Sequence, residues 1–360
     1  MNAIETQNLT RVFVRYNYVG TQVSMDREDN PGGLFLSLYN RYFNKNVKKE
    51  TLYAVNEVNI KVKKGQLVCI LGPNGCGKTT LLRILATLLQ PTQGTAYIMG
   101  HDVVKEEKVI WRYVTYVAGL LTGGAWMDPR LTPRDILTIQ ARLYGFPEER
   151  IRDALELSRL IDVANVRVST FSTGMLARLS VAIGLLRDSP VYLLDEPMVG
   201  ISKDVTEELY SYMKNDIQKR MGATFLYATN NVFEAQRLAD EIIMMYGGKV
   251  IAQGKIDELI TKFFKEQVIE IEISNCSFDI LKSIDSLPKV SKIINLTSKN
   301  ELDTTLAIYT AFPREILPIL IREILEKNGE IRYIKVREPT LEEVFIKVMK
   351  EKSKEGEVAS

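Results

Sequence analysis

The sequence lacks any apolar run that approaches the roughly 18 residues of a membrane-spanning helix, and no signal-peptide pattern follows Met1. It contains only three cysteines, of which Cys69 and Cys76 are close in sequence and Cys276 is far away. This spacing fits neither a disulfide framework nor a metal site, so we expect a reduced, cytosolic protein. Any role at a membrane must then depend on a partner that supplies the membrane-spanning segments.

The chain also lacks an excess of charge of either sign. Its 47 basic and 45 acidic residues leave a net charge of +2. Such a balance provides no basic field that could recruit nucleic acid, so we expect no nucleic-acid partner. The one histidine, His101, stands in a turn and is interpreted as a surface residue. With 360 residues and 46% apolar content, the chain is long enough for about two domains with real cores.

A glycine-rich stretch stands between an apolar run and a helical pattern. It reads Gly72-Pro73-Asn74-Gly75-Cys76-Gly77-Lys78-Thr79-Thr80, between residues 67–71 and 81–85. The order predicts a strand, a phosphate-binding loop and a helix, because glycines let backbone amides turn toward an anion at a helix N-terminus. Lys78 would reach the β- and γ-phosphates of a nucleotide, and the Thr79 hydroxyl would bind Mg²⁺.

A second apolar run, residues 191–194, ends in the two acids Asp195 and Glu196. Acids at the carboxyl end of a buried strand open onto the crevice where the phosphate loop lies. Asp195 can then hold Mg²⁺ through water, and Glu196 can polarise an attacking water molecule. Strands often end in an acid, so these two acids alone are weak evidence for a site. Together with the phosphate loop upstream they indicate a nucleotide site.

Strand and helix patterns alternate through the first 262 residues and predict a largely parallel α/β sheet. The helices between residues 132 and 168 are expected to form a side lobe, beginning at the cap Thr132-Pro133. Residues 15–51 are interpreted as an insertion with one short aromatic helix at 34–43, which packs on its own domain or contacts a membrane or membrane protein. The predicted strands are 4–14, 96–99, 113–117, 191–194, 223–227 and 241–245.

The pattern changes after about residue 262. Strands at 267–273, 290–297, 302–309 and 330–336 and helices at 278–287 and 317–327 give the order β-α-β-β-α-β, a ferredoxin-like unit. Thr340 and Glu343 form a capping box before a last amphipathic helix, which must dock on something through its apolar stripe. We therefore predict an ATP-binding domain at 1–262, an accessory domain at 263–352 and a disordered tail at 353–360.

A third motif, Phe171-Ser172-Thr173-Gly174-Met175, precedes a helical pattern at 176–186. Ser and Gly at a helix N-terminus can bind an anion, although Ser is also a routine helix cap. At this point the chain resembles the ATP-binding cassette (ABC) ATPases, in which LSGGQ or a relative precedes such a helix. Ser172 and Gly174 match that signature, whereas Phe171, Thr173 and Met175 depart from it.

The resemblance covers nearly the whole chain. The S-T-G-M form and the segment 339–345, P-T-L-E-E-V-F, resemble the branch of the family that exports drugs and polysaccharides. This resemblance implies a P-loop NTPase core with a helical side lobe, a small C-terminal α+β ferredoxin-like domain, and ATP and Mg²⁺ as cofactors. It also implies a homo- or heterodimer in which Ser172, Thr173 and Gly174 contact the ATP held by the partner. Separate membrane-spanning permease subunits would hold the chain at the cytoplasmic, inner face of the cell membrane.

Three positions depart from the family pattern. Gly119 or Leu120 stands where a Gln is expected, Ser202 replaces an Asp, and Asn230 replaces a His. Asn can hydrogen-bond a γ-phosphate but cannot shuttle a proton. We expect ATP hydrolysis that is slow in isolation, with Glu196 as the base and with Lys78 and Asn230 beside the γ-phosphate.

Other interpretations remain open at this stage. One alternative is a weakly hydrolysing, nucleotide-gated structural subunit of an asymmetric dimer, and another is a soluble ABC protein. Phe13 occupies the family position for stacking on adenine, Tyr53 competes for that role, and either ring could instead pack in the core.

Overall fold

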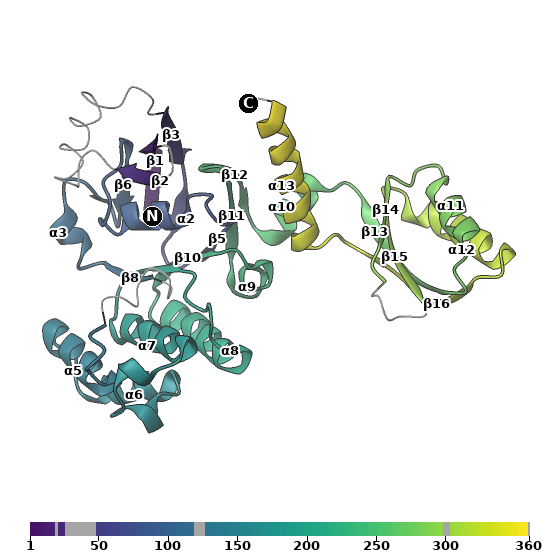
Figure 1. Cartoon of the computed structure of the whole chain (residues 1–360). Coiled ribbons are helices and arrows are strands. Elements are labelled where there is room, and N and C mark those ends of the chain that lie inside the picture. The colour runs from purple at the N-terminus through teal and green to yellow at the C-terminus, as the bar shows by residue number, and fades with distance from the viewer. Residues whose placement is uncertain (19–20, 26–47, 119–126, 298–302, 359–360) are drawn as a thin grey trace. The chain divides into compact units, whose positions relative to one another are not determined.

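The computed structural model describes residues 1–18, 21–25, 48–118, 127–297 and 303–358. The chain divides into two compact units, residues 1–254 and 255–360 (Figure 1). None of the helices within the described ranges combines the length and the apolar character needed to span a lipid bilayer.

A mostly parallel sheet forms the centre of the first unit. Its strand order is β12-β11-β5-β10-β9-β8, in which β12 pairs antiparallel with β11 and the other neighbours are parallel. Every residue of β5, β9 and β10 is buried, as the continuous apolar runs of these strands predict. The strands are β5 (Leu67–Leu71), β8 (Val114–Ala118), β9 (Val191–Asp195), β10 (Thr224–Thr229), β11 (Glu241–Tyr246) and β12 (Lys249–Gly254).

A second, antiparallel sheet is built on the long strand β1, which pairs with β2, β3, β4 and β6. Both ends of the predicted insertion at 15–51 belong to this sheet, because β1 continues to Tyr18, β3 begins at Lys48, and the two strands pair with each other. The helix predicted at 34–43 lies outside the described residues. The strands are β1 (Asn2–Tyr18), β2 (Thr21–Met25), β3 (Lys48–Val58), β4 (Lys61–Lys63), β6 (Gln93–Ile98) and β7 (His101–Asp102).

Helices flank the parallel sheet on both sides. Helix α2 contacts β9 as well as β3 and β6, so it lies between the two sheets. Helices α5, α6 and α7 pack on one another and form the predicted side lobe (Figure 1). Thr132 and Asp135 make the capping box of α5, and Gly145 ends the helix in the left-handed conformation. The helices are α2 (Lys78–Leu85), α3 (Glu107–Ile110), α5 (Pro133–Tyr144), α6 (Glu149–Leu157), α7 (Thr173–Leu186), α8 (Lys203–Tyr212) and α9 (Val232–Leu238), with 3₁₀ turns at Ile161–Val163 and Val168–Thr170 and a π-helical continuation of α8 at Met213–Arg220.

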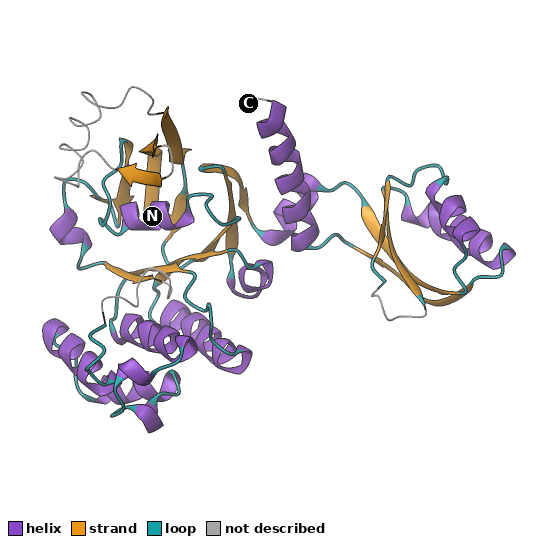
Figure 2. Ribbon diagram, in the orientation of Figure 1, coloured by secondary structure: helices purple, strands orange, loops and turns teal. Residues whose placement is uncertain are grey.

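The second unit contains an antiparallel sheet of strand order β14-β15-β13-β16, and its chain order is the predicted β-α-β-β-α-β. Figure 2 shows the strands of this unit in orange and its helices in purple. Isoleucines on one face of β13 pack against α11 and α12. Helix α12 begins at Pro313, one turn before the predicted start at residue 317, and it contains Pro318. The elements are β13 (Gln267–Ser274), α11 (Phe278–Asp285), β14 (Lys292–Asn295), β15 (Thr304–Thr310), α12 (Pro313–Glu326) and β16 (Glu330–Arg337).

Two further helices, α10 (Ile256–Phe263) and α13 (Leu341–Val358), pack on each other in the second unit. The ammonium of Lys347 donates to the carbonyl of Phe263 at 2.9 Å, and Val348 is buried. This packing groups α10 with the second unit, whereas the predicted domain boundary at residue 262 falls near the end of that helix. The disordered tail predicted from residue 353 was wrong as far as Val358, because Glu and Lys favour the helix that continues there.

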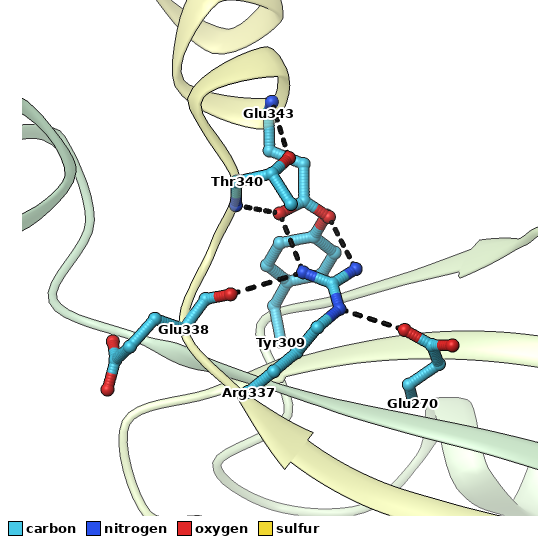
Figure 3. Close-up of polar contacts among 6 residues, drawn as sticks. All are labelled: Glu270, Tyr309, Arg337, Glu338, Thr340 and Glu343. Carbon is cyan, nitrogen blue, oxygen red and sulfur yellow. Dashed lines mark hydrogen bonds and ion pairs between the residues drawn. The ribbon is translucent and has the colours of Figure 1, made fainter. Parts of the chain in front are cut away.

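A polar cluster ties the start of α13 to the sheet (Figure 3). Arg337 forms a two-pronged ion pair with Glu343, both contacts 3.0 Å long, and its Nε donates to Glu270 at 2.8 Å. The Tyr309 hydroxyl donates to Glu343 at 2.6 Å. Thr340 and Glu343 exchange the two hydrogen bonds of the predicted capping box. Burial alone would raise the pKa of Glu343, but the hydrogen bonds from Arg337 and Tyr309 outweigh it and keep that pKa below its ordinary value.

We expect Arg337→Gln to destabilise the second unit by about 2 to 3 kcal/mol at neutral pH, because it leaves the partly buried Glu343 without its charge partner. A carboxyl with a lowered folded pKa stabilises the fold above its unfolded pKa and loses that effect as the pH falls through the folded pKa. The difference between wild type and variant should therefore shrink below about pH 4.3. Hydrogen exchange of peptides from the second unit, measured in urea at pH 7 and pH 4, checks both expectations.

Lys289→Gln serves as the matched control, since both side chains of the ion pair between Lys289 and Glu315 are exposed to solvent. It should change stability by no more than about 1 kcal/mol. A loss for Arg337→Gln that is the same at both pH values would contradict the proposed role of the Glu343 charge.

Candidate functional site

The glycine-rich loop connects β5 to α2, as predicted, and neighbouring backbone shapes it. Gly77 has φ +105°, and a Cβ there would lie 2.0 Å from the carbonyl oxygen of Ala54. A Cβ on Gly72 would lie 2.5 Å from the carbonyl oxygen of Met245. Glycine is therefore required at both positions, because any side chain would collide with backbone. The thiol of Cys76 is enclosed in the same loop, and burial raises its pKa.

Lys78 begins α2 and is buried, with 5% of its side chain exposed. Its ammonium donates to the carbonyls of Gly72 at 2.8 Å and Pro73 at 3.2 Å, so it lies within the loop that precedes it. The same ammonium is 3.4 Å from the carboxylate of Glu196. The structure thus brings the predicted lysine and the predicted base together at one point.

Glu196 follows β9 in a strained conformation. Its φ is +49°, a value that non-glycine residues rarely adopt, and its backbone amide donates to the carbonyl of Ala228 at 2.9 Å. Strain of this kind persists where the surroundings fix it, and it is concentrated at functional sites. The 27% exposure of the Glu196 side chain leaves its carboxylate open to water.

Asp195 is the last residue of β9, and its side chain contacts Thr79. The Thr79 hydroxyl donates to one oxygen of the Asp195 carboxylate at 3.0 Å, and the Tyr116 hydroxyl donates to the other at 3.3 Å. Burial raises the pKa of Asp195, and the two hydrogen bonds oppose this shift. Carboxylate and hydroxyl oxygens side by side suit Mg²⁺, which prefers oxygen ligands and takes only one or two from the protein when it also binds phosphates.

Asn230 stands after β10 and faces the phosphate loop. Its side-chain amide donates to the side-chain oxygen of Asn74 at 2.9 Å. The next residue, Asn231, caps α9 by accepting from two backbone amides. The structure thus places Asn230 against residues 72–80, on the opposite side of β5 from β11.

Ser172, Thr173 and Gly174 lie at the start of α7, on the helical lobe. The Ser172 hydroxyl caps α7 by accepting from the amide of Met175 at 3.3 Å. A Cβ on Gly174 would lie 2.5 Å from the carbonyl oxygen of Gly200, in the loop after β9. Among the described contacts, none joins these three residues to the phosphate loop of the same chain.

The two aromatic candidates for adenine lie on neighbouring strands. Phe13 pairs with Leu52 and Val12 pairs with Tyr53, so Phe13 and Tyr53 project from opposite faces of the β1–β3 ribbon. The Arg11 guanidinium lies over the Phe13 ring, 5.0 Å from its centre, and Tyr53 is 50% exposed. Which ring stacks on adenine stays a prediction.

Sequence reasoning missed Tyr116, the second donor to Asp195. The available signal was a tyrosine hydroxyl on the predicted strand 113–117, and burial raises the pKa of this hydroxyl to about 12, so it remains a proton donor. Gly119 and Leu120, the positions of the missing Gln, lie outside the described residues. Ser202 precedes α8, and His101 is one-third exposed, stacks on Tyr113 and contacts Glu106 at 2.9 Å.

Comparisons with known proteins agree with this geometry. Residues 55–199 match the family model described as ABC transporter, and residues 254–349 match the C-terminal domain of DrrA1-3-like ATP-binding proteins. The ABC transporter ATP-binding protein NatA of Bacillus subtilis is 36% identical over 59% of this chain and 86% of its own length. The daunorubicin resistance ATP-binding protein DrrA3 of Streptomyces coeruleorubidus is 32% identical over 81% of this chain and 90% of its own.

A solved structure supports the fold. The dimeric cassette MJ0796, in a post-hydrolysis state bound to ADP and Pi, has a TM-score of 0.54 and is 21% identical. The match covers 70% of this chain and 98% of that one. The family model and the two relatives establish that the chain belongs to the ABC transporter family, as an ATP-binding and ATP-hydrolysing subunit.

Proposed function

We propose that the chain is the ATP-hydrolysing subunit of an exporter and works beneath separate membrane-spanning permease subunits. The second unit supports the exporter assignment, because it matches the C-terminal domain of DrrA-like proteins and DrrA3 is named a daunorubicin resistance protein. The chain would then lie at the inner face of the cell membrane. In this proposal residues 1–254 are the catalytic domain and residues 255–360 an accessory domain.

The observation that carries the proposal is the joining of four side chains at one edge of the parallel sheet. Lys78 contacts Glu196, and Thr79 contacts Asp195, although the two pairs come from distant parts of the sequence. A lysine at phosphate-loop carbonyls supplies a positive charge that can move to the β- and γ-phosphates. A carboxylate next to it can accept the proton of an attacking water molecule.

Thr79 and Asp195 would hold Mg²⁺, which supplies positive charge to the phosphates when it is bound. Glu196, aligned by its fixed backbone, would take the proton from water. Asn74 and Asn230 would face the γ-phosphate as neutral groups. The protein's own part in the reaction is therefore to position the phosphates and to accept one proton.

The location of the signature supports a dimer. Ser172, Thr173 and Gly174 make local contacts on the lobe, so they remain available to the ATP of a second ABC subunit. That second subunit is either another copy of this chain or a different cassette. In both cases each ATP is bound by the phosphate loop of one subunit and the signature of the other.

A turnover measurement on the purified chain tests the proposed function. The wild type should hydrolyse MgATP slowly, because Asn230 cannot carry a proton, and Asn230→His should raise the rate by roughly tenfold or more. Asn215→His is the matched control, since Asn215 is exposed and contacts only its neighbours one turn away on the same helix among the described residues. An unchanged rate at saturating MgATP would show that Asn230 does not limit hydrolysis, and a complete absence of hydrolysis in both proteins would favour the structural-subunit alternative.

A further inference from the structure

We infer that Tyr116 is a positioning residue for the magnesium site and that its hydroxyl fixes the orientation of the Asp195 carboxylate. The inference rests on the proposed role of Asp195 as a metal ligand. It assigns a task to a side chain that belongs to none of the sequence motifs.

The Asp195 carboxylate is held from two sides. Thr79, on α2, donates to one oxygen, and Tyr116, on β8, donates to the other. Strand β8 runs parallel to β9 and pairs Ala118 with Asp195, which brings the tyrosine two residues earlier within reach. With 3% of Asp195 exposed, water has little access to replace either donor.

Nucleotide binding would leave these two donors with different tasks. The Thr79 hydroxyl is the group that would turn its oxygen toward Mg²⁺, and its hydrogen bond to Asp195 would change with that step. The Tyr116 hydroxyl has no such second task, so it would continue to hold the carboxylate. Outer partners of this kind orient the residues that bind a metal, and their loss typically lowers metal affinity by about 10- to 100-fold.

Arg83 completes the arrangement. It extends from α2 and adds a positive charge near the Tyr116 hydroxyl and the Asp195 carboxylate. This charge favours the ionised form of the Asp195 carboxylate, which is the form that accepts both hydrogen bonds.

Tyr116 also has a packing role, which the experiment must separate from the positioning role. Its ring packs against the hydrophobic core of the first unit. Tyr116→Phe keeps the ring and removes only the hydroxyl. Any effect on metal binding then reports on the hydrogen bond to Asp195.

The test measures ATP affinity of the full-length chain by calorimetry, first in EDTA and then at increasing Mg²⁺ concentrations. We expect Tyr116→Phe to leave ATP affinity in EDTA unchanged within about twofold and to raise the Mg²⁺ concentration for half-maximal tightening by about tenfold or more. Mn²⁺ binding in the presence of ATP, followed by electron paramagnetic resonance, provides a second readout that does not depend on turnover. Thermal unfolding in EDTA establishes that the variant is folded.

Tyr192→Phe is the matched control, because the Tyr192 hydroxyl bonds to the Arg187 carbonyl, away from Asp195. It should leave the Mg²⁺ midpoint unchanged. A folded Tyr116→Phe protein with a wild-type Mg²⁺ midpoint would overturn the inference. A loss of ATP affinity that is as large in EDTA as in Mg²⁺ would also overturn it, because it would indicate a disturbed phosphate loop. A wild-type chain whose ATP affinity does not respond to Mg²⁺ would instead refute the assignment of Asp195 as a metal ligand.

Discussion

Lys78→Ala is expected to abolish detectable ATP binding. The Lys78 ammonium is buried, lies within hydrogen-bond reach of two loop carbonyls, and is the only positive side chain within residues 72–80. Charge-assisted hydrogen bonds to two phosphates, each worth about 1.5 to 3 kcal/mol, amount to roughly 10²- to 10⁴-fold in affinity. Calorimetric titration with MgATP at a fixed protein concentration measures this loss directly.

Lys108→Ala is the matched control, because Lys108 is exposed on α3. It should bind ATP as the wild type does. The alanine variant at position 78 also removes the ammonium from beside Glu196, so its unfolding midpoint must be measured as well. Unchanged ATP affinity in a folded Lys78→Ala protein would refute the assignment of residues 72–80 as the phosphate-binding loop.

Glu196→Gln is expected to reduce ATP turnover by roughly 10²- to 10⁴-fold and to leave ATP binding nearly intact. Glutamine keeps the length of the side chain and the strained backbone position but cannot accept a proton. Glu107→Gln, on a short helix outside the site, controls for the loss of one negative charge. Steady-state turnover and calorimetric binding, measured on the same preparations, separate chemistry from affinity.

The size of this effect depends on the dimer that the chain forms. In a homodimer, Glu196→Gln should disable both sites. In a heterodimer with a cassette that retains the Gln and the His, Glu196→Gln should change turnover little. Ser172→Ala should reduce turnover strongly there, because Ser172 would contact the ATP bound by the partner. Ser172 also caps α7, so the alanine variant needs an unfolding control for an expected loss of about 1 kcal/mol. A heterodimer with the opposite ranking would show that the site built on Asn230 is the working one.

The parts of the site that the sequence predicts are those whose residues adjoin one another in the chain. The phosphate loop and the two acids after β9 are of this kind, since strand, turn and helix signals surround them. The contacts of Tyr116 with Asp195 and of Asn230 with Asn74 could not be predicted in this way. They depend on the order of β5, β10, β9 and β8 in the sheet, which no local pattern encodes.

The fold shows the same division between local and non-local information. The β-α-β-β-α-β order and the capping box of α13 follow from periodicity and caps. The antiparallel sheet around β1 does not, because the hydrogen bonds between β1 and β3 join segments separated by a long stretch of chain. Helix α12 starts earlier than predicted because Pro313 opens a helix well, and the fold tolerates Pro318 inside it. The place of α10 follows from its packing on α13, near the far end of the sequence.

The close approach of β3 to the phosphate loop bears on protein engineering. The carbonyl of Ala54 faces Gly77, and the carbonyl of Tyr53 lies 2.7 Å from where a Cβ on Gly248 would stand. The path of the loop is therefore set from outside by a strand upstream and by the turn after β11. Grafting residues 72–80 onto another strand and helix would transfer the residues of the motif without the neighbouring backbone that shapes the loop. A transplanted phosphate-binding loop would therefore have to be accompanied by β3 and the β11–β12 turn.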